Sequence, residues 1–129
     1  MNYYSLNNLI LMIGDPRQRS ACFKILSDNQ HLFRTVQGSS YNHQAWPGGY
    51  WDHVSEVMNI AVILYHKLNS IRPLFFHLSD ALLVLFLHDI EKPWKYEFGS
   101  DGSLQIIESL KTKEAQHKFR AKKLSEYGI

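Results

Sequence analysis

The sequence contains one cysteine and no long hydrophobic run, and each scarcity excludes a class of protein. Cys22 has no second cysteine to pair with in the chain, so an internal disulfide is excluded, which fits a reducing compartment. The longest apolar stretch, Ala81 to Leu87, is far shorter than the roughly 20 residues that span a membrane. Met1 is not followed by a basic segment and an apolar run, as in a secretory signal. We therefore expect a cytoplasmic protein without a membrane segment.

A large excess of either charge is also missing. The formal net charge of +2 is too small to indicate nucleic-acid binding by itself. The most basic stretch, Lys111 to Lys123, contains six Lys and Arg residues, but Glu108, Glu114 and Glu126 balance part of their charge. We therefore favour a solvated helix face here over a nucleic-acid surface, which stays the weaker alternative.

Histidine, by contrast, is abundant, with seven residues in the chain. It is the commonest metal ligand in proteins and the side chain that titrates near neutral pH. The rest of the composition is ordinary: 45% of the 129 residues are hydrophobic and 20% are charged. These values predict a single globular domain spanning residues 1–129, large enough to bury one core.

The first half of the chain predicts two short helices and a long loop. Leu and Ile mixed with Asn from Ser5 to Ile13 indicate a short helix. Asp15 as N-cap and Pro16 at the first helical position start a second helix, which runs towards Leu26. From Val36 to Tyr50, glycine, proline and asparagine argue against regular structure, and a loop of this length is more often functional than idle.

The second half predicts two strongly apolar helices and a polar one. Apolar residues recur at spacings of three and four from Val54 to Leu68, with Asp52 as the N-cap. The segment Ala81 to Glu91 also fits a buried strand, but the cap at Asp80 and its Leu-rich composition favour a helix. Leu104 to Tyr127 indicates one long helix or two shorter ones. We therefore expect an all-α domain of about five to six helices.

Three features of these helices point to a metal site. His53 lies at the start of one apolar helix, and His88 and Asp89 lie at the end of the next. Adjacent residues of a helix diverge by about 100°, so the pair can share an ion only in the groove between the two helices. Imidazole and carboxylate ligands suit Mn, Fe, Co, Ni or Zn, and with fewer nitrogens also Mg. Lys92, one turn further, could bind a phosphate oxygen.

Spacing alone leaves simpler interpretations open. A histidine in an apolar helix is often a packed or a surface residue. Asp89 to Lys92 could be the solvated end of a helix.

The same residues resemble the motifs of the HD-domain metal-dependent phosphohydrolases. The stretch from Tyr41 to His53, YNHQAWPGGYWDH, resembles the first motif, in which a His-containing Pro-Gly-Gly loop leads into a helix with an early His ligand. The stretch from Leu85 to Lys92, LFLHDIEK, resembles the second motif, a His-Asp pair followed by Lys. The separation of about 35 residues between the two motifs is also typical of the family.

The resemblance implies an all-α, HD-like fold with the site between the central helices. It implies hydrolysis of phosphate mono- or diesters, most often of nucleotides, by water that a divalent metal ion activates. His53, His88 and Asp89 would be the metal ligands. Lys92 would contact phosphate, and His43 would lie near the pocket.

The sequence departs from the family pattern in one respect. The family signature continues to a further Asp on a later helix, and no acidic residue after Asp89 stands in a matching context. Three explanations stay open. An acidic residue after Asp89 replaces the family's later Asp, another chain supplies this ligand, or the chain is a shortened form without the family's C-terminal helix. The alternative function is a non-catalytic HD-like module that binds a nucleotide or a protein partner. A homo-oligomer is expected if the Leu104 to Leu124 helix exposes apolar surface.

Overall fold

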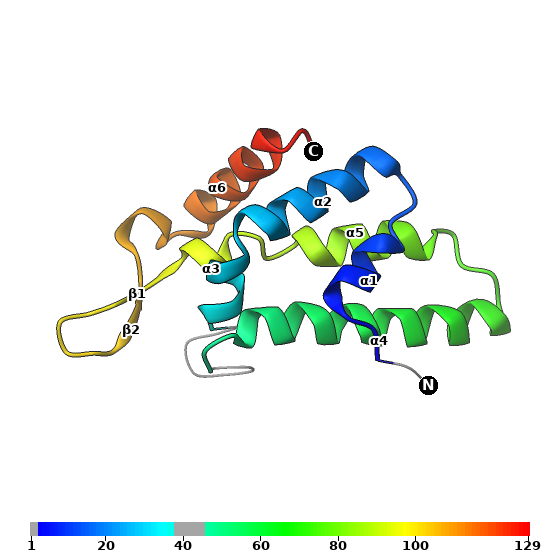
Figure 1. The fold of residues 1–129 in the computed structure, drawn as a ribbon, viewed down its shortest axis with the longest axis horizontal. Helices are drawn as coiled ribbons and strands as arrows, with labels where there is room; N and C mark the ends of the chain where they lie inside the picture. Colours follow the sequence, from blue (N-terminus) through cyan, green and yellow to red (C-terminus); the bar gives the residue numbers. More distant parts are fainter. Residues whose placement is uncertain (1–2, 38–45) are drawn as a thin grey trace.

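The computed structural model describes residues 3–37 and 46–129 (Figure 1). In this part of the chain, six α-helices and one two-stranded sheet form a mostly helical domain, as the sequence predicted. The elements are α1 (Leu6–Leu11), α2 (Pro16–Asp28), α3 (Gln30–Thr35), α4 (Gly49–Ile71), α5 (Leu78–Leu87), β1 (Tyr96–Phe98), β2 (Leu104–Ile106) and α6 (Lys113–Glu126), with short 3₁₀ turns η1 (Lys92–Trp94) and η2 (Glu108–Leu110).

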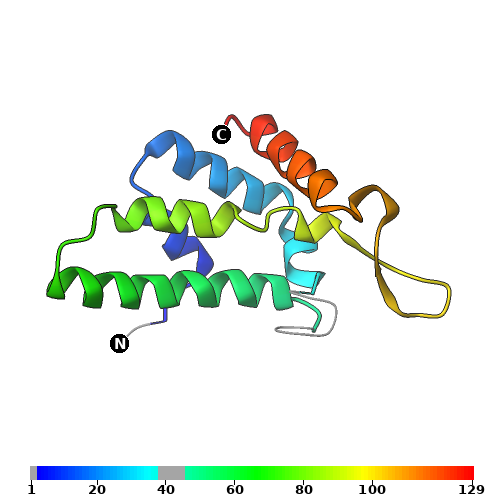
Figure 2. The same cartoon turned by 180° about the vertical axis from the view of Figure 1, so that it is seen from behind.

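The antiparallel pair α4 and α5 organises the domain (Figure 2). The two helices lie side by side, and α1 crosses behind them in this view. Their inner faces share one buried cluster with α1 and α2, in which Leu9, Ile10, Met58 and Leu82 are completely inaccessible to solvent. Because α4 and α5 run in opposite directions, the start of α4 and the end of α5 lie at the same end of the pair.

The cap predicted at Asp15 is confirmed, and Ser5, predicted only as the first residue of a helical segment, also caps its helix. The Ser5 side chain accepts a hydrogen bond from the Asn8 N–H, and the Asp15 side chain accepts one from the Gln18 N–H. These bonds satisfy backbone donors that a helix start leaves unpaired. The cap predicted at Asp52 is wrong, because α4 begins three residues earlier, at Gly49. α3 was not predicted, because the polar segment after α2 indicated a helix end.

The region after α5 differs most from the expectation. Leu104 to Tyr127 is not helical throughout: β2 pairs antiparallel with β1, with Tyr96 opposite Ile106 and Phe98 opposite Leu104. The turn between them contains Gly102 at φ 83°, a conformation that glycine adopts without strain. Aromatic and β-branched side chains on facing strands stabilise such a hairpin, and this pairing overrides the weak helical pattern.

α6 is the predicted polar helix, and none of its residues is fully buried. Its C-terminal end is held at the end of α2, where the Tyr127 hydroxyl donates to Asp28 at 3.0 Å and accepts from the Asn29 amide at 3.3 Å. Leu124 and Ile129 pack partly against the core. The described part of this region exposes no large hydrophobic side chain after Phe98, contrary to the expected apolar surface. None of the described helices is long and apolar enough to cross a bilayer.

The start of α4 depends on a glycine. Gly48, the N-cap of α4, has φ 81°, and a Cβ added there would lie 2.7 Å from the Arg34 carbonyl oxygen. A Cβ at Gly102 would have the same φ penalty but meet no atom within 4 Å. We expect Gly102→Ala to lower the free energy of unfolding by about 1 kcal/mol through strain alone, and Gly48→Ala by roughly 3 kcal/mol. Urea unfolding followed by circular dichroism measures both, and equal losses would contradict the role of the close contact.

Candidate metal centre

α4 carries His53 in its second turn, and several contacts fix the start of this helix. The Tyr50 N–H donates to the Val36 carbonyl at 3.1 Å, and the Trp46 indole donates to the Asp52 carboxylate at 2.8 Å. Tyr50 is buried on the inner side of the helix. His53 lies on a neighbouring side of α4 and is half-buried, so its imidazole faces the groove towards α5.

The prediction that the second apolar helix continues to Glu91 is wrong, because α5 ends at Leu87. Beyond this point the chain turns more tightly, and the Lys92 N–H donates to the Asp89 carbonyl, three residues earlier, at 2.9 Å. Pro93 explains the change, since proline has no N–H and its ring clashes with the carbonyl four residues before it, that of Asp89. The His-Asp pair therefore lies in a tight turn and not on a regular helix surface.

This turn orients the His88 ring. The His88 Nδ1 lies 2.7 Å from the Leu85 carbonyl oxygen, which can only accept a hydrogen bond, so Nδ1 carries the proton. The other ring nitrogen, Nε2, points at the Asp89 carboxylate, 3.0 Å from Oδ2. A backbone carbonyl that fixes the ring in this way is the usual support of a histidine that binds metal through Nε2.

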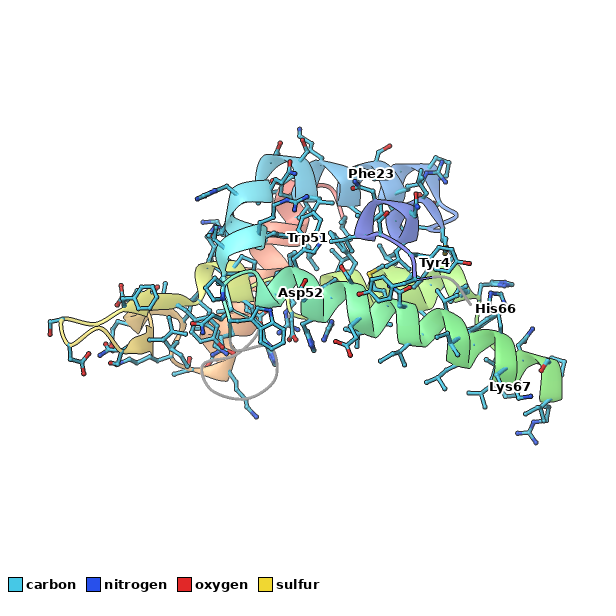
Figure 3. The ribbon with its side chains drawn as sticks, turned by 60° about the horizontal axis from the view of Figure 1, so that its bottom comes forward. Tyr4, Phe23, Trp51, Asp52, His66 and Lys67 are labelled. Carbon is cyan, nitrogen blue, oxygen red and sulfur yellow. The ribbon has the colours of Figure 1, made fainter. Side chains whose placement is uncertain are left out.

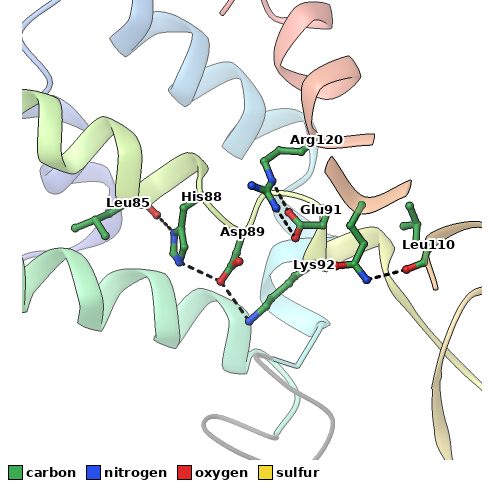
Figure 4. A network of polar contacts seen from close by, with 8 residues as sticks. Leu85, His88, Asp89, Glu91, Lys92, Leu110 and Arg120 are labelled. Carbon is green, nitrogen blue, oxygen red and sulfur yellow. Dashed lines mark hydrogen bonds and ion pairs between the residues drawn. The ribbon is translucent and has the colours of Figure 1, made fainter. Parts of the chain in front are cut away.

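The structure brings together the three predicted ligands and Lys92. One ligand atom from each of His53, His88 and Asp89 lies within 4.8 Å of the other two. The Lys92 Nζ is 3.3 Å from Asp89 Oδ2, so the lysine, the carboxylate and the His88 ring form one chain of contacts (Figure 4). His43, the remaining predicted site residue, lies outside the described residues.

The charges of the cluster are strongly coupled. Burial raises the pKa of the Asp89 carboxyl, but the hydrogen bond from His88 and the charge of Lys92 outweigh it and hold this pKa well below its usual range. The bond to Asp89 raises the pKa of His88, although burial opposes this. Burial, assisted by the Lys92 charge, lowers the pKa of His53. At neutral pH the cluster therefore offers a carboxylate and a neutral imidazole from two different elements.

The donor set fits a divalent cation. Two imidazole nitrogens and one carboxylate oxygen are ligands that Mn, Fe, Co, Ni and Zn accept. Two ligands on one ion, each at about 2.1 Å, are at most roughly 4.2 Å apart. Modest side-chain rotations therefore close the 4.8 Å cluster around an ion. His53, His88 and Asp89 are the side chains that would hold the ion.

No later carboxylate of the described chain joins this cluster. Glu91 is bound to Arg120, Glu108 to Lys111 and Glu114 to Lys118. Of the explanations for the absent Asp motif, a carboxylate from later in the chain is thus not supported. The candidate ligands in the described chain are therefore two histidines and one aspartate.

A second ion pair, which sequence reasoning missed, anchors the turn from outside the cluster. Glu91 is only 3% exposed, and its two carboxylate oxygens accept from the Arg120 Nε at 3.0 Å and Nη2 at 3.1 Å (Figure 4). The contact joins the turn between Asp89 and Lys92 to α6. The two residues are 29 positions apart, so no local sequence signal could have paired them.

Tyr50 also lies close to the site and was not singled out from the sequence. Its hydroxyl is buried and has no hydrogen-bond partner among the described residues. Burial raises the pKa of this phenol, and the charges of Asp89 and Glu91 raise it further. The hydroxyl is therefore a neutral donor beneath the His-Asp turn. In the sequence, Tyr50 is indistinguishable from other core aromatics.

A largely apolar pocket of about 490 Å³ lies on another side of the same turn. The end of α3 and the hairpin form its walls, through Leu32, Val36, Tyr96 and Phe98 among others, and Pro93 of the turn contributes to it. None of the three candidate ligands lines this pocket. The candidate metal cluster and this pocket are therefore distinct features.

Comparison of the chain with models of protein families, with curated proteins and with solved structures finds no match in any of the three.

The protonation of His88 predicts how metal binding depends on pH. A cation that binds Nε2 must displace the proton that this nitrogen shares with Asp89, and the pKa of His88 is raised. Affinity should therefore rise by about tenfold per pH unit below that pKa and level off above it. Calorimetric titration with Mn or Co from about pH 5.5 to about pH 8.5 tests this. An affinity that does not change over this range would exclude His88 as a ligand.

The Glu91–Arg120 pair predicts a large loss of stability when it is broken. Arg120→Ala leaves a carboxylate that is 3% exposed without its partner, so we expect a loss of about 3–5 kcal/mol in the free energy of unfolding. Adding Glu91→Gln to this variant should recover part of the loss, since the buried group is then neutral. Lys118→Ala is the control: it breaks an exposed pair and should cost less than about 0.5 kcal/mol. Equal effects of the two Ala substitutions would refute the anchoring role.

Proposed function

We propose that the chain is a metal-dependent phosphohydrolase that acts on a phosphate ester, with nucleotides as the substrate class. The observation that supports this most directly is the cluster of His53, His88 and Asp89 ligand atoms within 4.8 Å, with the Lys92 ammonium beside it. The resemblance of the two motifs to those of the HD-domain phosphohydrolases supports the same reaction.

The number of ligands favours a catalytic role over a structural one. Structural metal sites are closed by four protein ligands, whereas catalytic sites commonly have three and leave a position for water or substrate. Here three side chains converge, and each is only partly buried. Metal binding at this cluster would supply water activated for attack on phosphorus near neutral pH.

The chain's own residues have separate roles in this proposal. His53, His88 and Asp89 hold the cation, and the Leu85 carbonyl keeps the His88 ring in the orientation for binding through Nε2. Lys92 binds a phosphate oxygen and offsets the charge that grows on it during attack. Its side chain is 19% exposed and its ammonium is already held beside Asp89, so it needs little reordering to reach a substrate.

The test is phosphate release from a panel of nucleotides and phosphodiesters with Mn, Co, Ni or Mg. We expect turnover that chelator abolishes. His88→Ala should lose metal affinity by more than the roughly 10- to 100-fold typical of residues that only support a ligand. His66→Ala is the matched control, since His66 is an exposed histidine on α4 outside the cluster. Lys92→Ala should keep the metal and lower kcat by about 10²–10³.

Two outcomes would contradict the proposal. If the folded protein binds no metal even with excess ions, the cluster is not a metal site. If it binds metal stoichiometrically but turns over no phosphate ester, the chain is instead a non-catalytic binding module. Binding of a nucleotide that is unaffected by chelator and by His88→Ala would identify that module.

A further inference from the structure

The helix pair α4 and α5, with the segment that connects them, carries most of the large hydrophobic side chains that the described chain exposes. Of the twelve large hydrophobic residues that the described chain exposes, eight lie on these helices or their connection. We call them the apolar face: Ile60, Ile63, Leu64, Leu68, Ile71, Phe75, Phe76 and Val84. With roughly 200 Å² for a fully exposed side chain, they leave on the order of 900 Å² uncovered. The largest patch on a monomeric protein is typically about 300–600 Å².

The apolar face continues the stripe of α4 that holds His53. Along α4, each step from His53 to Ile60, from Ile60 to Leu64 and from Leu64 to Ile71 is four residues or the sum of three and four. All four side chains therefore lie along one side of the helix. On α5, Val84 precedes His88 by one turn. Figure 2 shows the ribbons of α4 and α5 side by side, with α1 behind them. A shallow apolar groove of about 210 Å³ runs between the helices, lined in part by Leu64, Leu68 and Phe76.

We propose that a second copy of this chain covers the apolar face, forming a two-fold symmetric dimer. A standard stable interface buries about 800 Å² on each partner, which the face supplies. Two-fold symmetry places the same surface on both partners. A helix with apolar residues at spacings of three and four packs well against a copy of itself.

The charges at the two ends of α4 set the direction of the pairing. Asp52 and Glu56 lie near its N-terminal end, and Lys67 and Arg72 lie near its C-terminal end, all of them exposed. Figure 3 shows Asp52 and Lys67 towards opposite ends of the helix. A parallel pair of α4 helices would bring like charges together, whereas an antiparallel pair brings unlike charges together.

The register follows from the sequence positions. A two-fold axis that passes between Ile60 and Leu64 places Glu56 within one residue of the level of Lys67 of the partner subunit. At 100° per residue, Glu56 and Lys67 lie within about 20° of each other around α4, so they share one flank of the interface. The end of the partner's α4 then lies beside the His53 end of this one, so the interface adjoins the metal centre. The dimer does not depend on the proposed reaction, because the apolar face exists whether or not a cation binds.

The first experiment is the mass of the metal-free protein in solution, by sedimentation equilibrium with chelator present. We expect twice the 15.1 kDa of the chain at micromolar concentrations. Leu64→Glu should give a monomer with unchanged helical circular dichroism. Leu11→Glu is the matched control, because Leu11 on α1 is 57% exposed and Leu64 is 52% exposed. Leu11 lies outside the apolar face, so this substitution should leave the dimer intact. A wild-type chain that stays monomeric at about millimolar concentration, where even weak interfaces form, would overturn the proposal.

The second experiment tests the antiparallel register by charge reversal. Lys67→Glu alone, or Glu56→Lys alone, places like charges against each other twice in the symmetric dimer, so each should raise the dissociation constant by roughly tenfold or more. Combining the two substitutions restores unlike charges and should restore the wild-type constant. Failure of the double variant to recover would refute this register. Recovery cannot arise from a monomer or from a different face of the molecule.

Discussion

The antiparallel packing of α4 against α5 is the constraint on which the rest of the structure depends. Both helices bury one side in the same cluster, where Met58 and Leu82 are completely inaccessible. That burial fixes their rotation, because turning either helix would expose its core side chains to water. With the rotation fixed, His53 near the start of one helix and His88 at the end of the other must face the same groove. The candidate site is thus a consequence of core packing.

Helix packing alone does not place the Asp89 carboxylate in this groove, because the side chains of His88 and Asp89 would point in different directions on a regular helix. The early end of α5 resolves this conflict: the turn that Pro93 favours brings the Asp89 side chain beside the His88 ring. The turn is tied down from one side by the Leu85 carbonyl and from the other by the Glu91–Arg120 pair. The outermost helix, α6, therefore contributes to the geometry of a site that it does not touch.

The sequence predicted those features that local patterns determine. The helix start at Asp15 follows from capping chemistry, and the apolar helices follow from spacing. The sequence also singled out the three residues that form the cluster, because the His-Asp pair and the earlier His lie on the two most apolar segments. The hairpin was missed because three-residue strands have too little pattern to outweigh a helical reading. The Arg120 contact was missed because its partner is 29 positions away, and only the folded chain brings the two together.

The stripe of α4 from His53 to Ile71 combines two demands that usually conflict. An apolar stripe in contact with water lowers solubility and favours association, yet a metal site for a soluble substrate must stay accessible. The stripe separates the two by position along the helix: the candidate ligand His53 is at the N-terminal end, and the exposed hydrophobic residues begin two turns later, at Ile60. In an antiparallel dimer the axis lies within the apolar segment, so the two sites fall at opposite ends of the interface. With the axis between Ile60 and Leu64, Ile71 of the partner subunit lies level with His53, so the edge of the interface forms an apolar border to each site.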